Sequence, residues 1–491
     1  MSLLDKVLSI YLVCFHPLSR YPGPKLWAIC RLPWAYHVLR GDLWHAYDRL
    51  HDIYGPVVRV APNELTFIAP ETWQDVYALS KTRPQLDKDP KAQLKPLISG
   101  ADSLFTAVGD DHRRIKGVFV GAFADKSLRD QTENIHDTST AFIQRLRHEK
   151  VKGQGVVDLH RILGYAAFDL GSDFTRGESP KTLEKPNEHH EFIHNFFMHA
   201  TVGTTKTCLD RYWPLGEILL GWVTWATAKQ RKANAKDSWA RMERRLATEV
   251  SRSDFITPVA DKISESGTKG TMTKAEVLVN QLAVLVAHSQ LTTIGLATTA
   301  FLLAREKLQL DRLVHEVRST FERESDITVT STKTLVYLEA VIQEALRINH
   351  PTPSSMPRIV PKGGLSVAGH FVPEGNIVGL SLYNIHTRPE NFYKPLEFHP
   401  ERFLDKSHPY YDPQFANDRM DAFKPFSTGP RGCLGNKLFW AEARVLIARL
   451  VWTFNFELAE PDSKESITWL RQRAWLVCEP KPVKVHLNEA W

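Results

Sequence analysis

The sequence is poor in the features that would mark a disulfide-rich or zinc-binding protein. Its 491 residues contain only five cysteines, namely Cys14, Cys30, Cys208, Cys433 and Cys478. An odd number of widely spaced cysteines argues against a disulfide framework and favours a reducing compartment. The chain also has no C-x-x-C pair, so no zinc site is predicted.

Charge of one sign is not concentrated anywhere in the chain. The net charge of +6 is spread along the sequence, and basic runs such as Arg113-Arg114 are short. We therefore expect no nucleic-acid partner, because proteins that bind nucleic acids present dense basic patches. A mildly basic face could still suit an acidic protein partner or an anionic membrane surface.

Flexible linkers, low-complexity tracts and internal repeats are also missing. A hydrophobic fraction of 43% and 13 tryptophans are enough to build a large core. These features predict one large domain and a monomer. Helical spacing of apolar residues predominates, so we expect a mainly α fold with a minor β part.

The N-terminus lacks an apolar run long enough to span a membrane. Its apolar stretch from Val7 to Phe15 has nine residues, whereas a spanning helix needs about 20. A Pro-rich hinge follows at 21–24. We interpret residues 1–24 as a short apolar segment with a residual or truncated anchor, and residues 25–491 as the folded domain.

Apolar periodicity predicts a series of helices and a few strands. The expected helices are His112–Ala122, Ser127–Lys150, Leu159–Asp173, Glu188–His199, Leu215–Val250, Thr273–Ala304, Lys307–Arg323 and Val336–Arg347. Alternating β-branched residues predict a hairpin at 57–68 and strands within 360–378. The Pro-, Lys- and Asp-rich stretch 82–103 is expected to be a loop.

One ten-residue run carries the clearest chemical signal in the chain. From Phe426 to Gly435 it reads Phe-Ser-Thr-Gly-Pro-Arg-Gly-Cys-Leu-Gly, and an apolar helical pattern follows at once. Gly429 and Gly435 allow a tight turn and close approach to a flat ligand. Backbone N–H groups at the turn and at the helix start can stabilise a Cys433 thiolate, and Arg431 can pair with a carboxylate.

This run resembles the heme-binding loop of the cytochrome P450 family. The resemblance extends over nearly the whole chain and is closest to fungal tailoring oxygenases of secondary metabolism, as in Tyr54-Gly-Pro-Val-Val-Arg-Val-Ala-Pro-Asn63. It implies the single-domain cytochrome P450 fold, with 25–491 as the heme-thiolate catalytic domain. It also implies heme b as cofactor, with Cys433 as the axial ligand of its iron.

Two further motifs agree with the resemblance. Glu344 and Arg347 lie three apart on one face of an apolar helix, and Arg402 follows in a Pro-Glu-Arg-Phe sequence. A buried Glu/Arg pair needs such further partners, because uncompensated buried charge is costly. These residues resemble the structural triad of the family, which lies behind the heme.

Heme carries two propionates, whose burial requires cations. Candidates are Arg431, Arg358, and the pair His112 and Lys116. The last two stand where the family has an aromatic residue and an arginine, so lysine offers a point charge in place of a planar fork. A solvated helix face is an equally open interpretation of His112 and Lys116.

The distal helix departs from the family pattern. Where the family carries Ala/Gly-Gly-x-Asp/Glu-Thr-Thr/Ser, this chain reads Ala-His-Ser-Gln-Leu-Thr at 287–292. A shift by one residue would put Thr292 in the catalytic threonine position. We prefer the unshifted register, which matches Ala287 and Thr292. It puts Gln290 at the acid and Leu291 at the alcohol.

The departure leaves the reaction open. Leu291 cannot hydrogen-bond through its side chain, and Gln290 cannot exchange a proton in the usual pH range. His288 can, unless it is a core histidine bonded to a helix carbonyl. One interpretation is oxidation with dioxygen, with protons from water, the substrate, His288 or Thr292. The other is redox-neutral chemistry with His288 as general acid or base.

The resemblance also suggests a substrate and partners. The pocket would use Ala283, Phe197, Ser354, Ser355 and Met356, with the 86–103 loop and a turn near 473–475, and would suit a lipophilic natural product. An oxidative enzyme would need an NADPH-cytochrome P450 reductase. The cations Lys424, Arg431, Lys437 and Arg444 could form its docking face. We expect association with the cytosolic face of the endoplasmic reticulum membrane.

Overall fold

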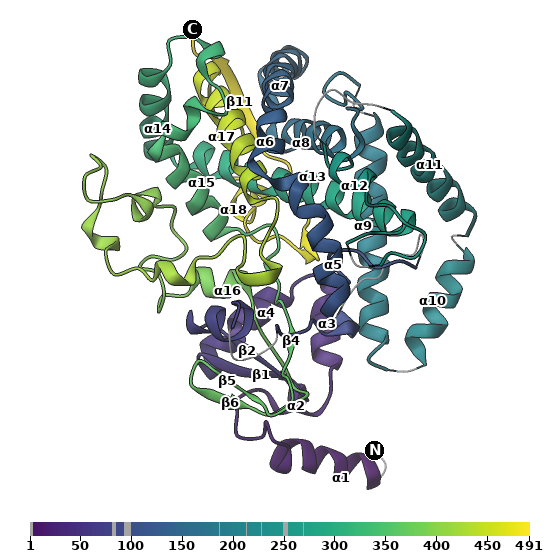
Figure 1. Cartoon of the computed structure of the whole chain (residues 1–491). Coiled ribbons are helices and arrows are strands. Elements are labelled where there is room, and N and C mark those ends of the chain that lie inside the picture. Colours follow the sequence, from purple (N-terminus) through teal and green to yellow (C-terminus); the bar gives the residue numbers. More distant parts are fainter. Residues whose placement is uncertain are drawn as a thin grey trace.

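The computed structural model describes residues 3–80, 85–92, 100–185, 187–212, 214–226, 228–248, 254–268 and 270–491. Helices make up most of this structure; several short strands lie near α4 (Leu43–Tyr54) at one end, and the last strand lies at the other end, near the C-terminus (Figure 1). The prediction of a mainly α fold with a minor β part is therefore confirmed.

The helices follow one another along almost the whole chain. They are α1 (Leu3–Ile10), α2 (Lys25–Ile29), α3 (Leu32–Arg40), α4 (Leu43–Tyr54), α5 (Gly109–Phe119), α6 (Asp125–Asp130), α7 (Thr132–Lys152), α8 (Leu159–Arg176), α9 (Asn187–Leu209), α10 (Leu215–Ala226), α11 (Ala228–Ala247), α12 (Thr257–Ala260), α13 (Lys274–Arg305), α14 (Lys307–Thr320), α15 (Val336–Ile348), α16 (Leu382–Thr387), α17 (Asn436–Thr453) and α18 (Lys464–Ile467). Short π-helical and 3-10 turns join several of them.

The strands form small sheets that combine distant parts of the chain. They are β1 (Val57–Ala61), β2 (Glu64–Phe67), β3 (Val156–Asp158), β4 (Arg358–Ile359), β5 (Leu365–Val367), β6 (His370–Val372), β7 (Ile377–Leu380), β8 (Phe454–Leu458), β9 (Ala474–Trp475), β10 (Val477–Cys478) and β11 (Lys484–Glu489). One sheet has the order β1-β2-β7-β4, with β2 parallel to β7, and another has the order β3-β11-β8. A bridge between Lys88 and Arg358 attaches the 85–92 segment to β4.

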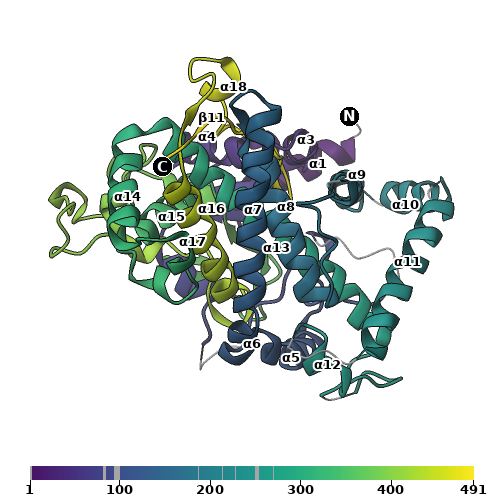
Figure 2. The same cartoon turned by 90° about the horizontal axis from the view of Figure 1, so that it is seen from above.

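Helix α13 runs through the middle of the molecule and packs along α8, as both views show (Figures 1 and 2). Its start is set by a capping box: Glu276 N donates to Thr273 Oγ1 at 3.2 Å, and Thr273 N donates to Glu276 Oε2 at 2.8 Å. By length and composition α13 could cross a membrane, but 67% of its apolar window is buried inside the protein. It is therefore a core helix.

The main hydrophobic core fills the space between α13 and its neighbours. Buried side chains from α7, α8, α13, α14, α15 and α17 form one continuous cluster. At Gly295 of α13, an added Cβ would lie 3.2 Å from the ring of Phe439 on α17. Glycine at this position therefore lets α13 and α17 approach closely, which matters because α17 begins directly after the cysteine loop.

Several predicted boundaries differ from the structure. The single helix expected over 215–250 is two helices, α10 and α11, and the one expected over 127–150 is divided between α6 and α7 at Gln131. The sheet of β3, β8 and β11 was not predicted. Its strands are short, and β3 pairs with β11 over more than 300 residues, so local pattern carries little signal for this sheet.

The N-terminal segment is partly integrated into the fold. Val7 and Phe15 are exposed, but Leu18 is fully buried, and Tyr21 Oη donates to the Phe371 carbonyl at 2.6 Å. Arg59 Nη1 also donates to the Leu12 carbonyl at 2.8 Å. The part of residues 1–24 that follows Phe15 thus packs on the sheet region, whereas the apolar part before it remains exposed.

Candidate active site

The loop from Phe426 to Gly435 makes a compact turn that only glycine permits at one position. Gly429 has φ +72°, and an added Cβ would lie 2.2 Å from the Tyr77 carbonyl oxygen. Cys433 N donates to the Phe426 carbonyl at 2.9 Å, which closes the turn. The loop therefore presents the cysteine from a rigid backbone at the start of α17.

The sulfur of Cys433 is both accessible and enclosed. Its side chain has exposed surface, yet burial raises the pKa of the thiol, while hydrogen bonds from the N–H groups of Gly435 and Asn436 counteract this. The exposed surface and the raised pKa are compatible because the sulfur faces an interior space rather than bulk water. An electron-pair acceptor such as a metal ion would stabilise the thiolate there.

The residues before the loop are held by aromatic packing and a buried histidine. The ring of Phe426 lies 5.5 Å from Phe439 and 6.2 Å from Trp440, centroid to centroid. His350 Nε2 donates to the Pro425 carbonyl at 2.8 Å, and burial lowers the pKa of His350 so that the ring is neutral. The entry to the loop is thus fixed to the segment that follows α15.

A cluster of cationic side chains lies beside the loop. Its members are Arg431 and Arg358, the α5 residues His112 and Lys116, and Lys88 of the 85–92 segment. Lys116 Nζ bonds the Pro430 carbonyl, and Arg431 Nη2 donates to the Ala107 carbonyl at 2.8 Å. The structure thus brings together all four residues predicted as propionate partners.

The cations of this cluster repel one another. Burial and the charges of Arg358 and Arg431 lower the pKa of Lys88 to about 7. Burial and the same surroundings lower the pKa of His112 to about 3, so its ring is neutral and can donate one hydrogen bond. Within the described part of the chain, Arg431 Nε and Nη1 are buried without a hydrogen-bond partner. A dianionic group would satisfy these atoms and relieve the repulsion.

Lys88 was missed by the sequence reasoning. It lies in a Lys- and Asp-rich stretch that looks like a solvated loop, and no motif singles it out. The antiparallel bridge between Lys88 and Arg358 turns the segment inward, where Lys88 Nζ donates to the Phe105 carbonyl at 2.7 Å. Only the fold reveals that this lysine belongs to the cluster.

The Glu344, Arg347 and Arg402 side chains form the buried ionic group that their spacing indicated. Arg347 donates to both Glu344 oxygens at 2.7 and 2.8 Å, and Arg402 Nε donates at 3.0 Å. All three side chains have no exposed surface. Arg347 also bonds the carbonyls of His386 and Pro395, which ties α15 to the segment that leads towards the cysteine loop.

One stripe of α13 keeps exposed surface although most of the helix is buried. Ala283, Ala287 and Leu291 recur at four-residue spacing along this stripe, whereas Gln290 and Thr292 are only 4% and 3% exposed. We call these three residues the open stripe. Its pattern agrees with the unshifted register, because Leu291 rather than Thr292 follows Ala287 along it. The stripe offers methyl groups and no proton donor.

His288 is turned away from the open stripe. Its Nε2 lies 2.8 Å from Glu442 Oε1 of α17, and both side chains are buried. Burial by itself would lower the pKa of His288, but the charge and hydrogen bond of Glu442 outweigh it and raise the pKa. A backbone hydrogen bond with Ala167 of α8 also raises this pKa, so the contacts fit a core histidine bonded to a helix carbonyl and do not favour His288 as an acid or base towards a substrate.

Aromatic residues of α9 continue the apolar surface of the open stripe. Phe196 and Phe197 pack with Leu291 and Tyr383 against a small core around Trp44. Ser354, Ser355 and Met356 lie at the edge of the β sheet, where the Met356 carbonyl accepts from Tyr77 Oη at 2.7 Å. The predicted 86–103 loop lies partly outside the described residues, as do the side chains of residues 192–195.

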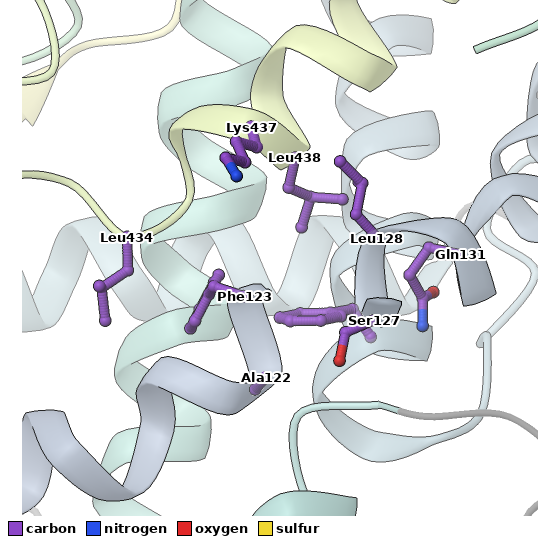
Figure 3. A pocket seen from close by; sticks show the side chains of 9 residues that line it. Ala122, Phe123, Ser127, Leu128, Gln131, Leu434, Lys437 and Leu438 are labelled. Atoms are coloured by element: carbon purple, nitrogen blue, oxygen red, sulfur yellow. The ribbon is translucent and has the colours of Figure 1, made fainter. Parts of the chain in front are cut away.

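Of the four cations expected to form a docking face for the reductase, three are engaged with other groups of the protein. Arg431 belongs to the cation cluster, and Arg444 is mostly buried beside Glu339 at 3.1 Å. Lys437 is exposed but pairs with Asp125. Next to it, a space for about one water molecule opens between α6, α8, α17 and the adjoining turns (Figure 3), lined by Ala122, Phe123, Ser127, Leu128, Gln131, Phe174, Leu434, Lys437 and Leu438.

These features fit one kind of group. An enclosed thiol, a cation cluster with unpartnered buried donors, and an apolar stripe suit a flat metal-containing molecule with two carboxylates. The sequence profile described as Cytochrome P450 matches residues 21–487. The chain belongs to the cytochrome P450 family. The fold is therefore the cytochrome P450 fold, as its sequence predicted.

Curated cytochrome P450 enzymes of fungi are similar to this chain over most of their length. The cytochrome P450 monooxygenase astJ of Aspergillus oryzae is 35% identical, with 96% of this chain and 94% of the relative covered. The averantin hydroxylase of Dothistroma septosporum is 34% identical, with 97% and 88% covered. The cytochrome P450 monooxygenase lcsI of Purpureocillium lilacinum is 35% identical, with 98% and 91% covered.

Membership of the family establishes the cofactor and the class of protein. Cytochromes P450 bind heme b, and this chain is accordingly a heme-containing oxidoreductase whose relatives are fungal monooxygenases of natural-product pathways. The prediction that this chain is a cytochrome P450 enzyme of the fungal secondary-metabolite type is thus confirmed.

Proposed function

We propose that this cytochrome P450 oxidises a lipophilic fungal natural product, by hydroxylation, desaturation or oxidative cyclisation. Dioxygen is the oxidant, and electrons come from an NADPH-cytochrome P450 reductase. The observation that carries the proposal is the accessible Cys433 sulfur at the base of an otherwise enclosed site, with two backbone N–H groups directed at it.

In this proposal the loop and the cation cluster hold the cofactor. Cys433 would hold the heme iron through its thiolate, supported by Phe426, Gly429 and Gly435 of the loop. Arg358, Arg431 and Lys88 neutralise the propionates, and Lys116 and neutral His112 add hydrogen bonds. Bound heme supplies the redox chemistry of dioxygen, and the thiolate makes its iron electron-rich.

The open stripe shapes the oxidising side. Ala283, Ala287 and Leu291 form an apolar wall with Phe197, which excludes water from a bound lipophilic substrate. Because Leu291 cannot carry a proton, ordered water or a hydroxyl of the substrate delivers protons here. Ser354 and Ser355 serve as polar anchors beside Met356.

The proposal is tested by reconstitution with a fungal reductase. A panel of terpenoids, polyketides and indole alkaloids, with averantin included, is incubated with enzyme, NADPH and isotopically labelled dioxygen. We expect an oxidised product from at least one compound, formed only when reductase, NADPH and dioxygen are all present. Label in the product identifies hydroxylation, whereas loss of hydrogen without label identifies desaturation or cyclisation.

The matched control omits one component at a time. Product that forms undiminished without dioxygen and without reductant would contradict the oxidative proposal and support redox-neutral chemistry. The averantin sample also tests substrate range, since a relative is named for its hydroxylation.

We further propose that two exposed apolar segments bind the cytosolic face of the endoplasmic reticulum membrane. The first comprises residues 7–15, where Val7, Leu8, Ile10 and Phe15 are 54–72% exposed. The second is α10, where Ile218, Trp222 and Trp225 are 63–78% exposed. Exposed tryptophans beside aliphatic side chains are typical of helices that lie in the membrane interface.

Replacement of both α10 tryptophans by alanine should weaken membrane binding. Burying one large side chain contributes about 1.5–3 kcal/mol, so the partition constant of Trp222→Ala/Trp225→Ala should fall at least about tenfold. The measurement is flotation with phosphatidylcholine vesicles containing anionic lipid. Trp491→Ala, which removes a tryptophan that is 75% exposed at the C-terminus, is the control. Equal flotation of all variants would contradict the role of α10.

A further inference from the structure

His288 is the most unusual residue of the distal helix, and its contacts come from two other helices. Its Nε2 donates towards the Glu442 carboxylate of α17 at 2.8 Å, with the side chains 8% and 2% exposed. The opposite edge of the ring faces α8, where a backbone hydrogen bond with Ala167 raises the pKa of His288. One imidazole thus connects α8, α13 and α17.

Gly171 of α8 provides the room for this ring. An added Cβ at Gly171 would lie 2.5 Å from His288 Nδ1, closer than real atoms approach. Glycine in the middle of a helix costs about 0.5–1 kcal/mol relative to alanine, so its presence here calls for a packing reason. The large side chain at 288 and the missing side chain at 171 are complementary.

The contact between His288 and Glu442 is connected to the cysteine loop, because Glu442 lies on α17, which follows that loop directly. This helix begins at Asn436, three positions after Cys433, and holds α13 at two sites, through Phe439 at Gly295 and through Glu442 at His288. A change at the His288–Glu442 pair would therefore shift the open stripe relative to the helix that carries the thiolate.

We propose that His288 is a positioning residue: together with Glu442 and Gly171 it sets where the open stripe of α13 lies over the heme. It acts through the placement of Ala287 and Leu291 and does not contact the substrate. This inference rests on the proposed function, because it concerns the geometry of the heme site.

Two features of the pair support positioning rather than proton delivery. Nε2 is engaged by Glu442, and Nδ1 faces α8, so neither nitrogen is directed to the open stripe. The Nδ1 side of the ring lies against α8, where a backbone hydrogen bond with Ala167 raises the pKa of His288. Both edges of the ring are thus held by neighbouring helices.

The test compares five variants of the His288–Glu442–Gly171 contact and one control variant, all in the heme-loaded protein. His288→Ala and Glu442→Ala should each accelerate hydrogen exchange at the amides of residues 283–295 by about tenfold or more, as expected for loss of a coupled buried pair. Both should also change the affinity of imidazole, used as a distal heme ligand, by at least about threefold. Glu442→Gln, whose Oε1 can still accept from Nε2, should retain most of the original behaviour.

Gly171→Ala should reproduce the His288→Ala effects, because the new methyl displaces the ring. Combining Gly171→Ala with His288→Ala should add nothing further, since the space is then free. Asp254→Asn is the matched control: the Arg245–Asp254 pair is equally buried, at 8% and 2%, but joins α11 to the next loop. It should leave exchange in 283–295 and imidazole affinity within about twofold.

The outcomes separate this inference from the proposed function. If the unaltered chain lacks a thiolate-type carbon monoxide spectrum, the proposed function fails. If that spectrum is normal and the His288→Ala variant matches Asp254→Asn in exchange and imidazole affinity, positioning by His288 is wrong. Additive effects of Gly171→Ala and His288→Ala would also overturn it.

Discussion

Replacing Cys433 by serine should abolish the thiolate spectrum of the heme. In the reduced, carbon-monoxide-bound protein we expect the Soret band to move to the position of a heme without thiolate. Turnover should fall more than about 100-fold, because loss even of outer-shell partners of a metal typically costs about 10–100-fold. A hydroxyl cannot replace the thiolate, which is the anionic, electron-donating form.

The control for this variant is Cys208→Ser. Cys208 is 2% exposed in a separate apolar cluster, and burial raises the pKa of its thiol to about 12. Its loss should leave the spectrum unchanged, at a modest cost in stability. If Cys433→Ser kept the thiolate band, or if Cys208→Ser lost it, Cys433 would not be the iron ligand.

Features encoded in contiguous residues were predictable from the sequence. The cysteine loop combines glycine, arginine and cysteine at fixed spacing, and the Glu344–Arg347 pair lies within one apolar helix. The length of α13 followed from its continuous apolar pattern, which predicted a helix over Thr273–Ala304 against the observed Lys274–Arg305. In each case the local chemistry and the tertiary environment point the same way.

Features that depend on distant pairing were not predictable. Lys88 joins the cation cluster only through a bridge to Arg358, 270 positions later. Gly171 and Glu442 acquire meaning only when α8 and α17 meet at His288. A weak signal existed at Glu442, the one acid in the largely apolar segment Asn436–Thr453, because such a residue needs a buried partner.

Glu344→Gln should severely destabilise the protein and reduce its heme content. Removing this carboxylate leaves the buried Arg347 guanidinium without a carboxylate partner and Arg402 with Asp418 alone, a change that typically costs about 3–5 kcal/mol. The measurements are urea unfolding of the heme-loaded protein and the heme-to-protein ratio. Asp311→Asn is the control, because the Lys307–Asp311 pair is exposed and should contribute at most about 1 kcal/mol.

The pH dependence and a double variant distinguish charge from shape at this triad. Burial alone would raise the pKa of Glu344, but Arg347 and Arg402 lower it. Its contribution is therefore fully present above the unfolded pKa of about 4.3 and is lost as pH falls through the lower folded value. Arg347→Met added to Glu344→Gln removes the guanidinium that has lost its carboxylate and should recover part of the stability. If the double variant is no more stable than Glu344→Gln, loss of charge balance is not the cause, and the hydrogen bonds from Arg347 to the His386 and Pro395 carbonyls dominate instead.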